Sequence, residues 1–183
     1  MRIHYISALF MIDLTAEELK QYFSDDIFKR ISETADELGL ECYVVGGYVR
    51  DIFLQRPSKD IDVVVVGSGI AMAEALGKRL GRGAHVSVFK NFGTAQLKYY
   101  GTEVEFVGAR KESYTHDSRK PIVEDGTLED DQNRRAFTIN ALAVCLNRVR
   151  SGELVDPFGG IGDLKEKTIR TPPNPDLPFS NDP

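Results

Sequence analysis

The sequence predicts an α/β domain of the α+β kind, with one mixed sheet of about five strands flanked by helices. Two short runs rich in β-branched residues, 41–46 and 61–66, read as strands that are buried on both faces. Stretches with apolar residues at helical spacing precede and follow these strands. Two alternating runs on either side of Gly101 read as a β-hairpin. Strands that alternate with helices in this way pack as a helix layer on a sheet.

The bulk composition is that of a folded domain in a reducing compartment. The 183 residues suffice for one good-sized domain, and a charged fraction of 28% is ordinary for globular proteins. No apolar run approaches the roughly 20 residues that cross a bilayer, so no membrane contact is expected. Cys42 and Cys145 lie in apolar segments without zinc-type spacing, which is typical of buried thiols. We therefore expect a cytoplasmic protein.

Charge is distributed unevenly along the chain. The net charge is −5, but residues 78–120 carry nine basic and four acidic side chains. Residues 1–41 carry four basic and nine acidic side chains. A basic middle segment is suited to RNA phosphates while an acidic N-terminal part faces away, and a mosaic surface is the equal alternative.

Residues 1–40 are predicted to form helices that pack on the rest of the domain. The stretch 15–18, TAEE, has the form of a capping box and starts one helix. A second helix follows Ser24, has one apolar face over 27–38, and ends at Gly39.

A strand, a glycine pair and a short helix follow over residues 41–54. Gly46 and Gly47 let the backbone turn and approach a ligand closely. Arg50 lies one turn into the helix, where its planar group suits phosphate oxygens, and Asp51 is suited to orient or neutralise an arginine. An ordinary strand-to-helix turn is the alternative.

Asp60 and Asp62 open the second strand and are two positions apart. Residues i and i+2 of a strand share a face, so both carboxylates project together, about 7 Å apart along the chain. Two carboxylates beside a buried strand repel each other unless a cation neutralises them, and hard oxygen ligands suit Mg²⁺. The alternative is a strand that begins in water.

The next segment supplies a helix and three strands. The helix is expected from Ser68 to Leu80, after a Gly-Ser-Gly turn that invites a dinucleotide-binding interpretation. Met72 occupies the position of the last glycine of that fingerprint, which argues against it. Strands are expected at 86–89, 95–99 and 103–107.

Two motifs together resemble a known family. GGYVRD at 46–51, followed by DID at 60–62 and a run of valines, resembles the first motif of class II tRNA nucleotidyltransferases (CCA-adding enzymes) and bacterial poly(A) polymerases. RRAFTINALA at 134–143 matches the family's RRDFTINALA in nine of ten positions. The resemblance covers about residues 41–183 and implies a polymerase-beta-like nucleotidyltransferase domain.

The resemblance also implies a third acid and a loop. EVEFVGAR at 103–110 resembles the family's third-carboxylate strand, in which an acid precedes an arginine by five positions. Arg110 then fixes that acid as Glu105, with Glu103 as the alternative if the register is off by two. Residues 108–131 are polar, and the family implies a mobile loop over the active site between Arg110 and the next helix.

That next helix is expected to carry RRAFTINALA, with the acidic run 129–131 just before it. Near its start, Arg134 and Arg135 suit triphosphate oxygens or a ribose hydroxyl, and Asn140 suits a sugar or a loop backbone. Ala136 departs from the family, which has Asp there; loss of that acid predicts weaker nucleotide binding or turnover.

Three apolar side chains of the same stretch, Phe137, Leu142 and Leu146, are expected in the core rather than as a platform for a base.

The C-terminal part closes the domain. ELVDPFGG at 153–160 predicts a strand and a turn in which Asp156 is structural; a helical turn and a short strand at 168–170 follow. The proline-rich stretch 171–183 reads as a linker toward a neck that is absent. The division is thus 1–40 helices, 41–170 head and 171–183 linker.

The resemblance implies a metal-dependent transfer of CMP or AMP from CTP or ATP to the 3′ end of tRNA. Asp60, Asp62 and Glu105 would hold two Mg²⁺ ions, for which Mn²⁺ can substitute. The nucleotide-binding residues would be Gly46, Gly47, Arg50, Asp51, Arg134, Arg135 and Asn140. Three alternatives stay open: a poly(A) polymerase, a transferase acting on a small molecule such as an aminoglycoside, and an inactive nucleotide- or RNA-binding module.

Overall fold

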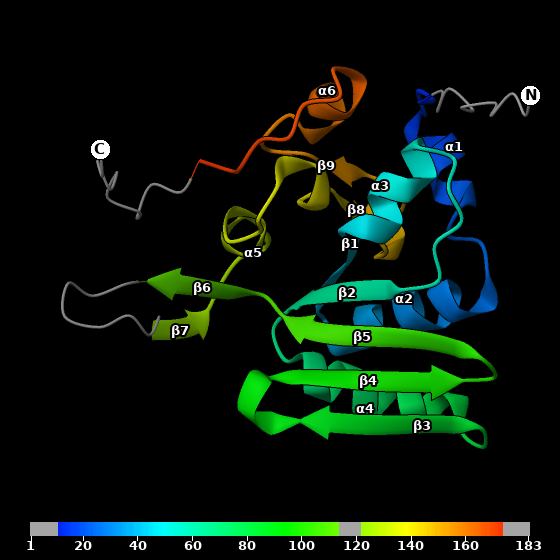
Figure 1. The fold of residues 1–183 in the computed structure, drawn as a ribbon. Coiled ribbons are helices and arrows are strands. Elements are labelled where there is room, and N and C mark those ends of the chain that lie inside the picture. The colour runs from blue at the N-terminus through cyan, green and yellow to red at the C-terminus, as the bar shows by residue number, and fades with distance from the viewer. Residues whose placement is uncertain (1–10, 114–121, 174–183) are drawn as a thin grey trace, which may run out of the picture.

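The computed structural model describes residues 11–113 and 122–173 (Figure 1). Its α-helices are α1 Ala16–Gln21, α2 Asp26–Leu38, α3 Gly47–Phe53, α4 Gly69–Leu80, α5 Leu128–Asn133 and α6 Gly160–Lys165. Its strands are β1 Glu41–Val45, β2 Ile61–Val66, β3 Ala84–Phe89, β4 Thr94–Tyr99, β5 Thr102–Gly108, β6 Arg110–Ser113, β7 Ile122–Asp125, β8 Ala143–Cys145 and β9 Leu154–Val155. Short 3₁₀ turns are η1 Lys90–Phe92, η2 Thr138–Asn140 and η3 Arg148–Arg150.

The main sheet has seven strands in the order β3-β4-β5-β2-β1-β8-β9. Its β2–β5 pair is parallel, and its other neighbours are antiparallel. The mixed sheet flanked by helices is confirmed, and the strand count exceeds the expected five. β8 is the unexpected member, because it lies in the stretch that was expected to be helical.

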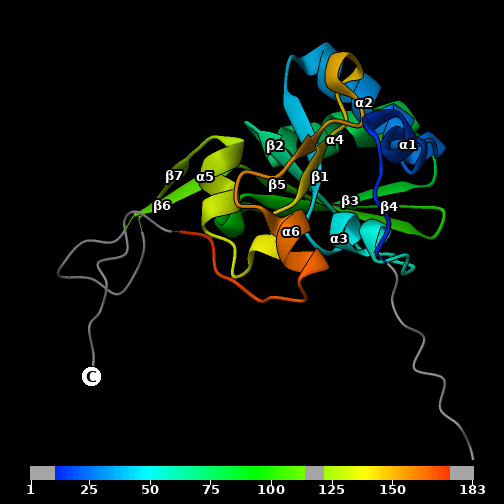
Figure 2. The ribbon, with the colours of Figure 1, turned by 90° about the horizontal axis from the view of Figure 1, so that it is seen from above.

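The two faces of the sheet have different coverings. Ile61, Val63 and Val65 of β2 join the larger core, which includes the apolar faces of α2 and α4. Figures 1 and 2 show both helices on one side of the sheet. Val64 points to the other side, into a smaller core with Leu128 of α5. Asp62 shares the face of Val64 because side chains alternate along a strand. The acidic side chain is therefore on the face opposite α2 and α4.

The helix ends follow the capping signals of the sequence. Thr15 accepts a hydrogen bond from the Glu18 N–H, as a capping residue should. Ser68 does the same for the Ala71 N–H at the start of α4. Gly39 ends α2 in the left-handed conformation, with φ 65°. The predicted helices of residues 15–38 and 68–80 are confirmed in kind.

Asn147 ties three elements together. Its Oδ1 accepts a hydrogen bond of 2.8 Å from the Cys42 N–H of β1. Its Nδ2 donates to the Leu40 carbonyl at 2.8 Å and to Asp36 of α2 at 2.9 Å. One side chain thus satisfies backbone groups where α2 turns into the sheet.

The described part of the segment 108–131 contains more secondary structure than expected. β6 and β7 pair as a separate two-stranded sheet, and α5 then begins at Leu128. α5 starts with a capping box, in which Thr127 and Asp130 bond each other's backbone N–H groups. The acidic run 129–131 lies inside this helix rather than before it, so that expectation was wrong. The remainder of the expected loop, 114–121, lies outside the described residues.

RRAFTINALA does not form a helix: Arg134 caps the C-terminus of α5, η2 follows, and β8 ends the motif. No strand forms at 168–170 in this described part of the chain, although the Arg170 carbonyl accepts a hydrogen bond from the Thr138 N–H. Residues 1–10 of the N-terminal region and 174–183 of the predicted linker lie outside the described residues.

None of the helices formed by the described residues is both long and apolar enough to cross a membrane.

Gly69 determines how closely α4 approaches β5. A Cβ on Gly69 would lie 2.9 Å from the Gly108 nitrogen and 2.9 Å from the Val107 carbonyl carbon. Backbone atoms cannot move aside as a flexible side chain can, so we expect Gly69→Ala to lower the free energy of unfolding by about 1–3 kcal/mol. Urea unfolding measures this. The matched control is Gly162→Ala in α6, where an added Cβ meets nothing within 4 Å; it should be neutral or slightly stabilising. Equal stability of the two variants would contradict the close approach.

Candidate functional site

The parallel pairing of β2 and β5 brings two acidic side chains together. Asp62 is the direct partner of Glu105, and the flanking pairs are Ile61 with Val104 and Val63 with Phe106. Partners in adjacent strands share a face, so both carboxylates point to the side opposite α2 and α4. Asp60 lies just before β2 and is exposed.

Glu103 lies on the same strand but has other partners. Its carboxylate is 2.9 Å from Lys98 Nζ and accepts a hydrogen bond of 3.2 Å from Gln96. Its strand partner is Lys98 rather than a residue of β2. The geometry thus puts Glu105, and not Glu103, beside Asp62.

The electrostatics of Asp62 reflect this crowding. Burial raises the pKa of the Asp62 carboxyl above its ordinary value, Glu105 raises it further, Arg135 opposes the rise, and Asp60 adds a smaller increase. Each acid therefore makes ionisation of Asp62 less favourable, as expected for like charges in a partly buried position. A cation at this position would relieve that cost.

The carboxylate oxygens of these acids are suitable ligands for a metal ion, but they are not arranged around a common metal position. Across 11–113 and 122–173, no group of three or more His, Cys, Asp or Glu side chains is close enough to hold a metal ion. Within the same ranges, no ion pair involves Asp60, Asp62 or Glu105. Carboxylate oxygens suit a hard divalent cation. Asp60 and Glu105 are exposed, so their side chains have room to turn toward a bound ion.

The turn at residues 46–47, called here the glycine turn, lies next to an arginine. Gly46 has φ 75° and ψ −136°, a backbone conformation that residues other than glycine rarely adopt. A Cβ at Gly46 would lie 3.5 Å from Arg135 Nη1 and 3.7 Å from the Asn140 carbonyl oxygen. Segments about 90 residues apart in the chain therefore meet at this turn.

Arg50 is held by two neighbours. Its Nε donates to Asp51 Oδ1 at 2.9 Å, and its Nη1 donates to Asn140 Oδ1 at 2.8 Å. The Arg50 and Asp51 side chains are part-buried, with exposures of 27% and 15%. Its Nη2 lies 3.5 Å from the position of a Cβ on Gly47. Arg50, Asp51, Asn140 and the glycine turn thus form one connected group.

Asp131 binds both arginines of the pair and was missed as a functional candidate. Its Oδ1 accepts from Arg134 Nε at 3.0 Å and Nη2 at 2.8 Å. Its Oδ2 accepts from Arg135 Nε at 3.2 Å and Nη2 at 2.9 Å. The acid lies three and four positions before the arginines, so helical spacing was the available signal. Because the acidic run 129–131 was expected to precede the helix, this spacing was not applied to Asp131.

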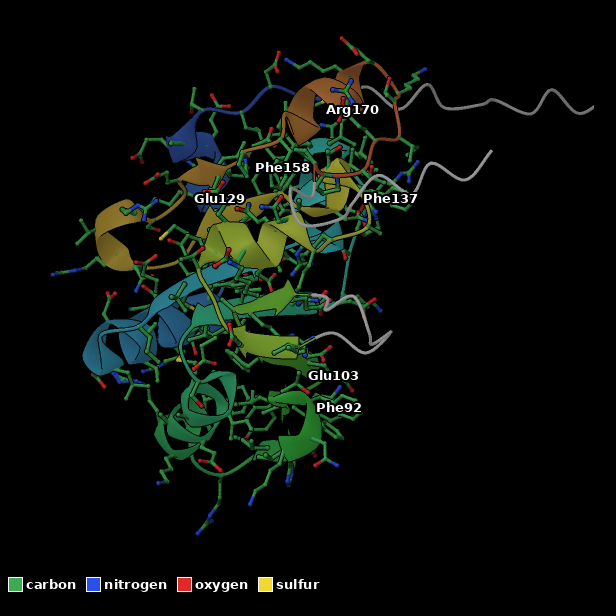
Figure 3. All side chains as sticks on the ribbon, turned by 90° about the vertical axis from the view of Figure 1, so that its left-hand side faces the viewer. Phe92, Glu103, Glu129, Phe137, Phe158 and Arg170 are labelled. Carbon is green, nitrogen blue, oxygen red and sulfur yellow. The ribbon has the colours of Figure 1, made fainter. Side chains whose placement is uncertain are left out.

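The residues after the arginine pair are exposed. Ala136 is exposed, and Phe137 has 38% of its surface accessible, so the expectation that Phe137 belongs to the core was wrong. Leu142 and Leu146 are buried, as expected. Figure 3 shows Phe137 and Glu103 on the same side of the molecule, away from α2 and α4.

The stretch RRAFTINALA packs against α6. Thr138 donates a hydrogen bond of 2.6 Å to the buried Asp163, which also pairs with Arg170 at 3.2 Å. Asp156 accepts hydrogen bonds from the Gly160 and Ile161 N–H groups at the start of α6. Asp156 is therefore in contact with its own turn, which is a structural role.

A family model and solved structures match this arrangement. The model described as "Poly A polymerase head domain" matches residues 42–170. An A-adding tRNA nucleotidyltransferase of Aquifex aeolicus (strain VF5) is 46% identical over 131 residues, which are 72% of this chain and 16% of that protein.

Two solved structures are similar over most of the chain. "The structure of CCA-adding enzyme apo form II" has a TM-score of 0.78 at 35% identity, over 86% of this chain and 38% of that one. "Crystal structure of tRNA nucleotidyltransferase complexed with a primer tRNA and an incoming ATP analog" has a TM-score of 0.67 at 42% identity, over 77% of this chain and 38% of that one. The chain spans less than two fifths of the length of these relatives.

The mixed sheet, with its neighbouring acidic strand residues beside a glycine turn and an arginine pair, defines a polymerase-beta-like nucleotidyltransferase domain. The chain belongs to the poly(A) polymerase head domain family, the family of tRNA nucleotidyltransferases and CCA-adding enzymes.

The raised pKa of Asp62 predicts a pH-dependent effect of its removal. A carboxyl whose pKa is higher in the folded than in the unfolded state stabilises the fold at low pH, and this contribution is lost as pH rises through the folded pKa. Asp62→Asn should therefore raise Tm at pH 7 without added metal by about 1–4 °C, with little effect near pH 4. Differential scanning calorimetry between these pH values measures the change. Glu74→Gln, an exposed acid of α4, is the control and should leave Tm unchanged at both pH values. An Asp62→Asn variant that is less stable at pH 7 would contradict the crowding of charges.

Proposed function

We propose that the domain transfers a nucleoside monophosphate from CTP or ATP to the 3′-hydroxyl of a tRNA, with release of pyrophosphate. The observation that carries the proposal is the register of β2 and β5, which sets Asp62 beside Glu105. The other strand partner of Asp62 is Val45, which precedes the glycine turn that Arg135 approaches. The relatives named as an A-adding tRNA nucleotidyltransferase and as a complex with a primer tRNA and an ATP analog support tRNA as the acceptor and ATP as a donor. The name CCA-adding enzyme, and a structure of such an enzyme with CTP, support CTP as the other donor.

Asp60, Asp62 and Glu105 are the residues that would hold two Mg²⁺ ions. Bound there, the ions would lower the pKa of the attacking hydroxyl and would stabilise charge on the α-phosphate. The carboxylates contribute negative charge that no described arginine or lysine neutralises by a direct ion pair. Side-chain general bases are not required for such a transfer.

Three arginines and the glycine turn are suited to the triphosphate. Arg50, Arg134 and Arg135 are part-buried, and each is oriented by an acid that leaves N–H groups free for another acceptor. Planar guanidinium groups bind phosphate oxygens in pairs, which orients the ligand as well as attracting it. Asn140 uses its side-chain oxygen for Arg50, so it orients that arginine and leaves its amide N–H groups for a ligand.

The second candidate function rests on Ala136. This residue is exposed next to Arg135, at the position where the family has an acid. A head without that acid fits an RNA- or nucleotide-binding module that does not turn over substrate. A-only addition, as in a poly(A) polymerase, is a third possibility that the same acceptor chemistry allows.

The metal assignment predicts the effect of losing one acid. Asp60→Ala or Asp62→Ala should lower Mg²⁺-dependent incorporation of labelled AMP or CMP into a tRNA lacking its 3′ end by about 100-fold or more, because transition-state charge is no longer neutralised. The circular dichroism spectrum should stay unchanged. Glu103→Gln is the matched control on the same strand face, and it should retain incorporation. Loss of activity in Glu103→Gln with retention in a Glu105→Gln variant would move the third acid to the alternative register.

Ala136 allows a gain-of-function experiment. Ala136→Asp should increase incorporation about tenfold or more if the missing acid limits turnover, since one charge-assisted hydrogen bond contributes about 1.5–3 kcal/mol. Ala136→Asn has nearly the same shape without the charge and is the control. Nucleotide incorporation that appears only in the Asp variant would favour a binding module that does not turn over substrate. Full activity of the unaltered chain would show that this acid is dispensable.

A further inference from the structure

Asp131 is a completely buried carboxylate whose hydrogen bonds all come from two cationic side chains. Its side chain is 0% exposed, and each of its oxygens accepts two N–H groups from one guanidinium. Both arginines use the same edge, Nε and Nη2. The Nη1 groups remain directed elsewhere: that of Arg135 toward the glycine turn, and that of Arg134 toward Glu112 Oε1 at 3.8 Å.

The three groups together carry a net charge of +1. One arginine neutralises the charge of the buried carboxylate, and the second, which satisfies the other carboxylate oxygen, adds a surplus positive charge that Asp131 does not neutralise. The Arg134 and Arg135 side chains retain exposures of 22% and 19%, which leaves the surplus charge accessible to a ligand from one side.

Arg135 also has a second acid within electrostatic reach. Its Nη1 lies 3.5 Å from the position of a Cβ on Gly46, and Gly46 follows Val45, the strand partner of Asp62, yet the hydrogen bonds of Arg135 go to Asp131. A guanidinium that turned to Asp62 would form an ion pair with it and compete with any cation for the same oxygens. For Arg135 to bind an anion while Asp62 binds a cation, another group must keep Arg135 from pairing with Asp62.

We propose that Asp131 is a positioning residue that holds Arg135 away from the acidic pair Asp62 and Glu105 and orients Arg134 beside it, so that the arginines stay available to an anion and the acids to a divalent cation. The ligands named here rest on the proposed function. Asp131 itself touches neither ligand, because its side chain is fully buried beneath the two arginines.

The test uses Asp131→Asn, which preserves shape but directs an amide N–H₂ at one of the arginines. Mn²⁺ affinity, followed by electron paramagnetic resonance, should fall about tenfold although residue 131 is not a ligand. CTP affinity, measured by calorimetry, should fall by a similar factor. In the double variant Asp131→Asn/Arg135→Gln, Mn²⁺ affinity should recover because no cation remains to intrude on Asp62, while CTP affinity should stay low.

Two controls separate positioning from a purely structural role. Asp163→Asn removes another buried carboxylate, 3% exposed, and should lower Tm while Mn²⁺ affinity is kept. Glu129→Gln removes an exposed charge of α5 and should change neither quantity. If Asp131→Asn lowers Tm but binds Mn²⁺ as the unaltered chain does, the proposal is overturned.

A final readout does not depend on any ligand. In nuclear magnetic resonance spectra, the Nε–H signals of Arg134 and Arg135 should be protected from exchange in the unaltered chain and lose that protection in Asp131→Asn. Unchanged signals would overturn the positioning role even if nucleotides bind. If the unaltered chain binds neither Mn²⁺ nor CTP, the proposed function fails, and these arginine signals still decide the role of Asp131.

Discussion

The parallel pairing of β2 with β5 is the constraint on which the candidate site depends. In the described sheet, these two neighbours run in the same direction, so the chain must cross over between them through α4, β3 and β4. The pairing register decides which acid of β5 faces Asp62. A shift by one residue would turn Glu105 to the opposite face, among the apolar side chains that contact α2 and α4. The close approach of α4 to β5 at Gly69 fixes this crossover from the helix side.

Charge in the site is separated into an acidic and a basic part. Arg50 has Asp51 and Asn140 as partners, and the other two arginines share Asp131. Opposite charges that are free to pair would cancel each other and leave neither for a ligand. Local partners within hydrogen-bond distance prevent that collapse, while burial and the neighbouring Glu105 raise the pKa of Asp62. The solved relatives described with a primer tRNA and an ATP analog, or without ligand, share this fold at 35–42% identity.

Sequence patterns predicted the fold class and the residues around the glycine turn, because both rest on short-range signals. Glycine pairs, capping residues and β-branched runs act over a few positions, and so α2, α3, α4 and the first five strands were foreseen. β8 was not, since a short apolar run such as 141–146 fits either a helix or a buried strand, and only its pairing with β1 decides. The exposure of Phe137 was not foreseen either. Its apolar side chain predicts a core position, but its exposure depends on how η2 packs on α6. The function of Asp131 required knowing that α5 begins at Leu128, which depends on the capping box of Thr127.

Asn147 has a consequence for how the polypeptide acquires its structure during synthesis. The hydrogen bond between its Oδ1 and the Cys42 N–H joins residues that are 105 positions apart. At a translation rate of about 5–20 residues per second, Asn147 is synthesised about 5–20 s after Cys42. The Cys42 N–H lacks this acceptor until then. During that interval the edge of β1 that later receives β8 has no strand beside it, and an unpaired strand edge can associate with another chain. The β1 edge is therefore open to association with another chain until β8 has been made, although Tyr43, Val44 and Val45 of β1 are buried once folding is complete.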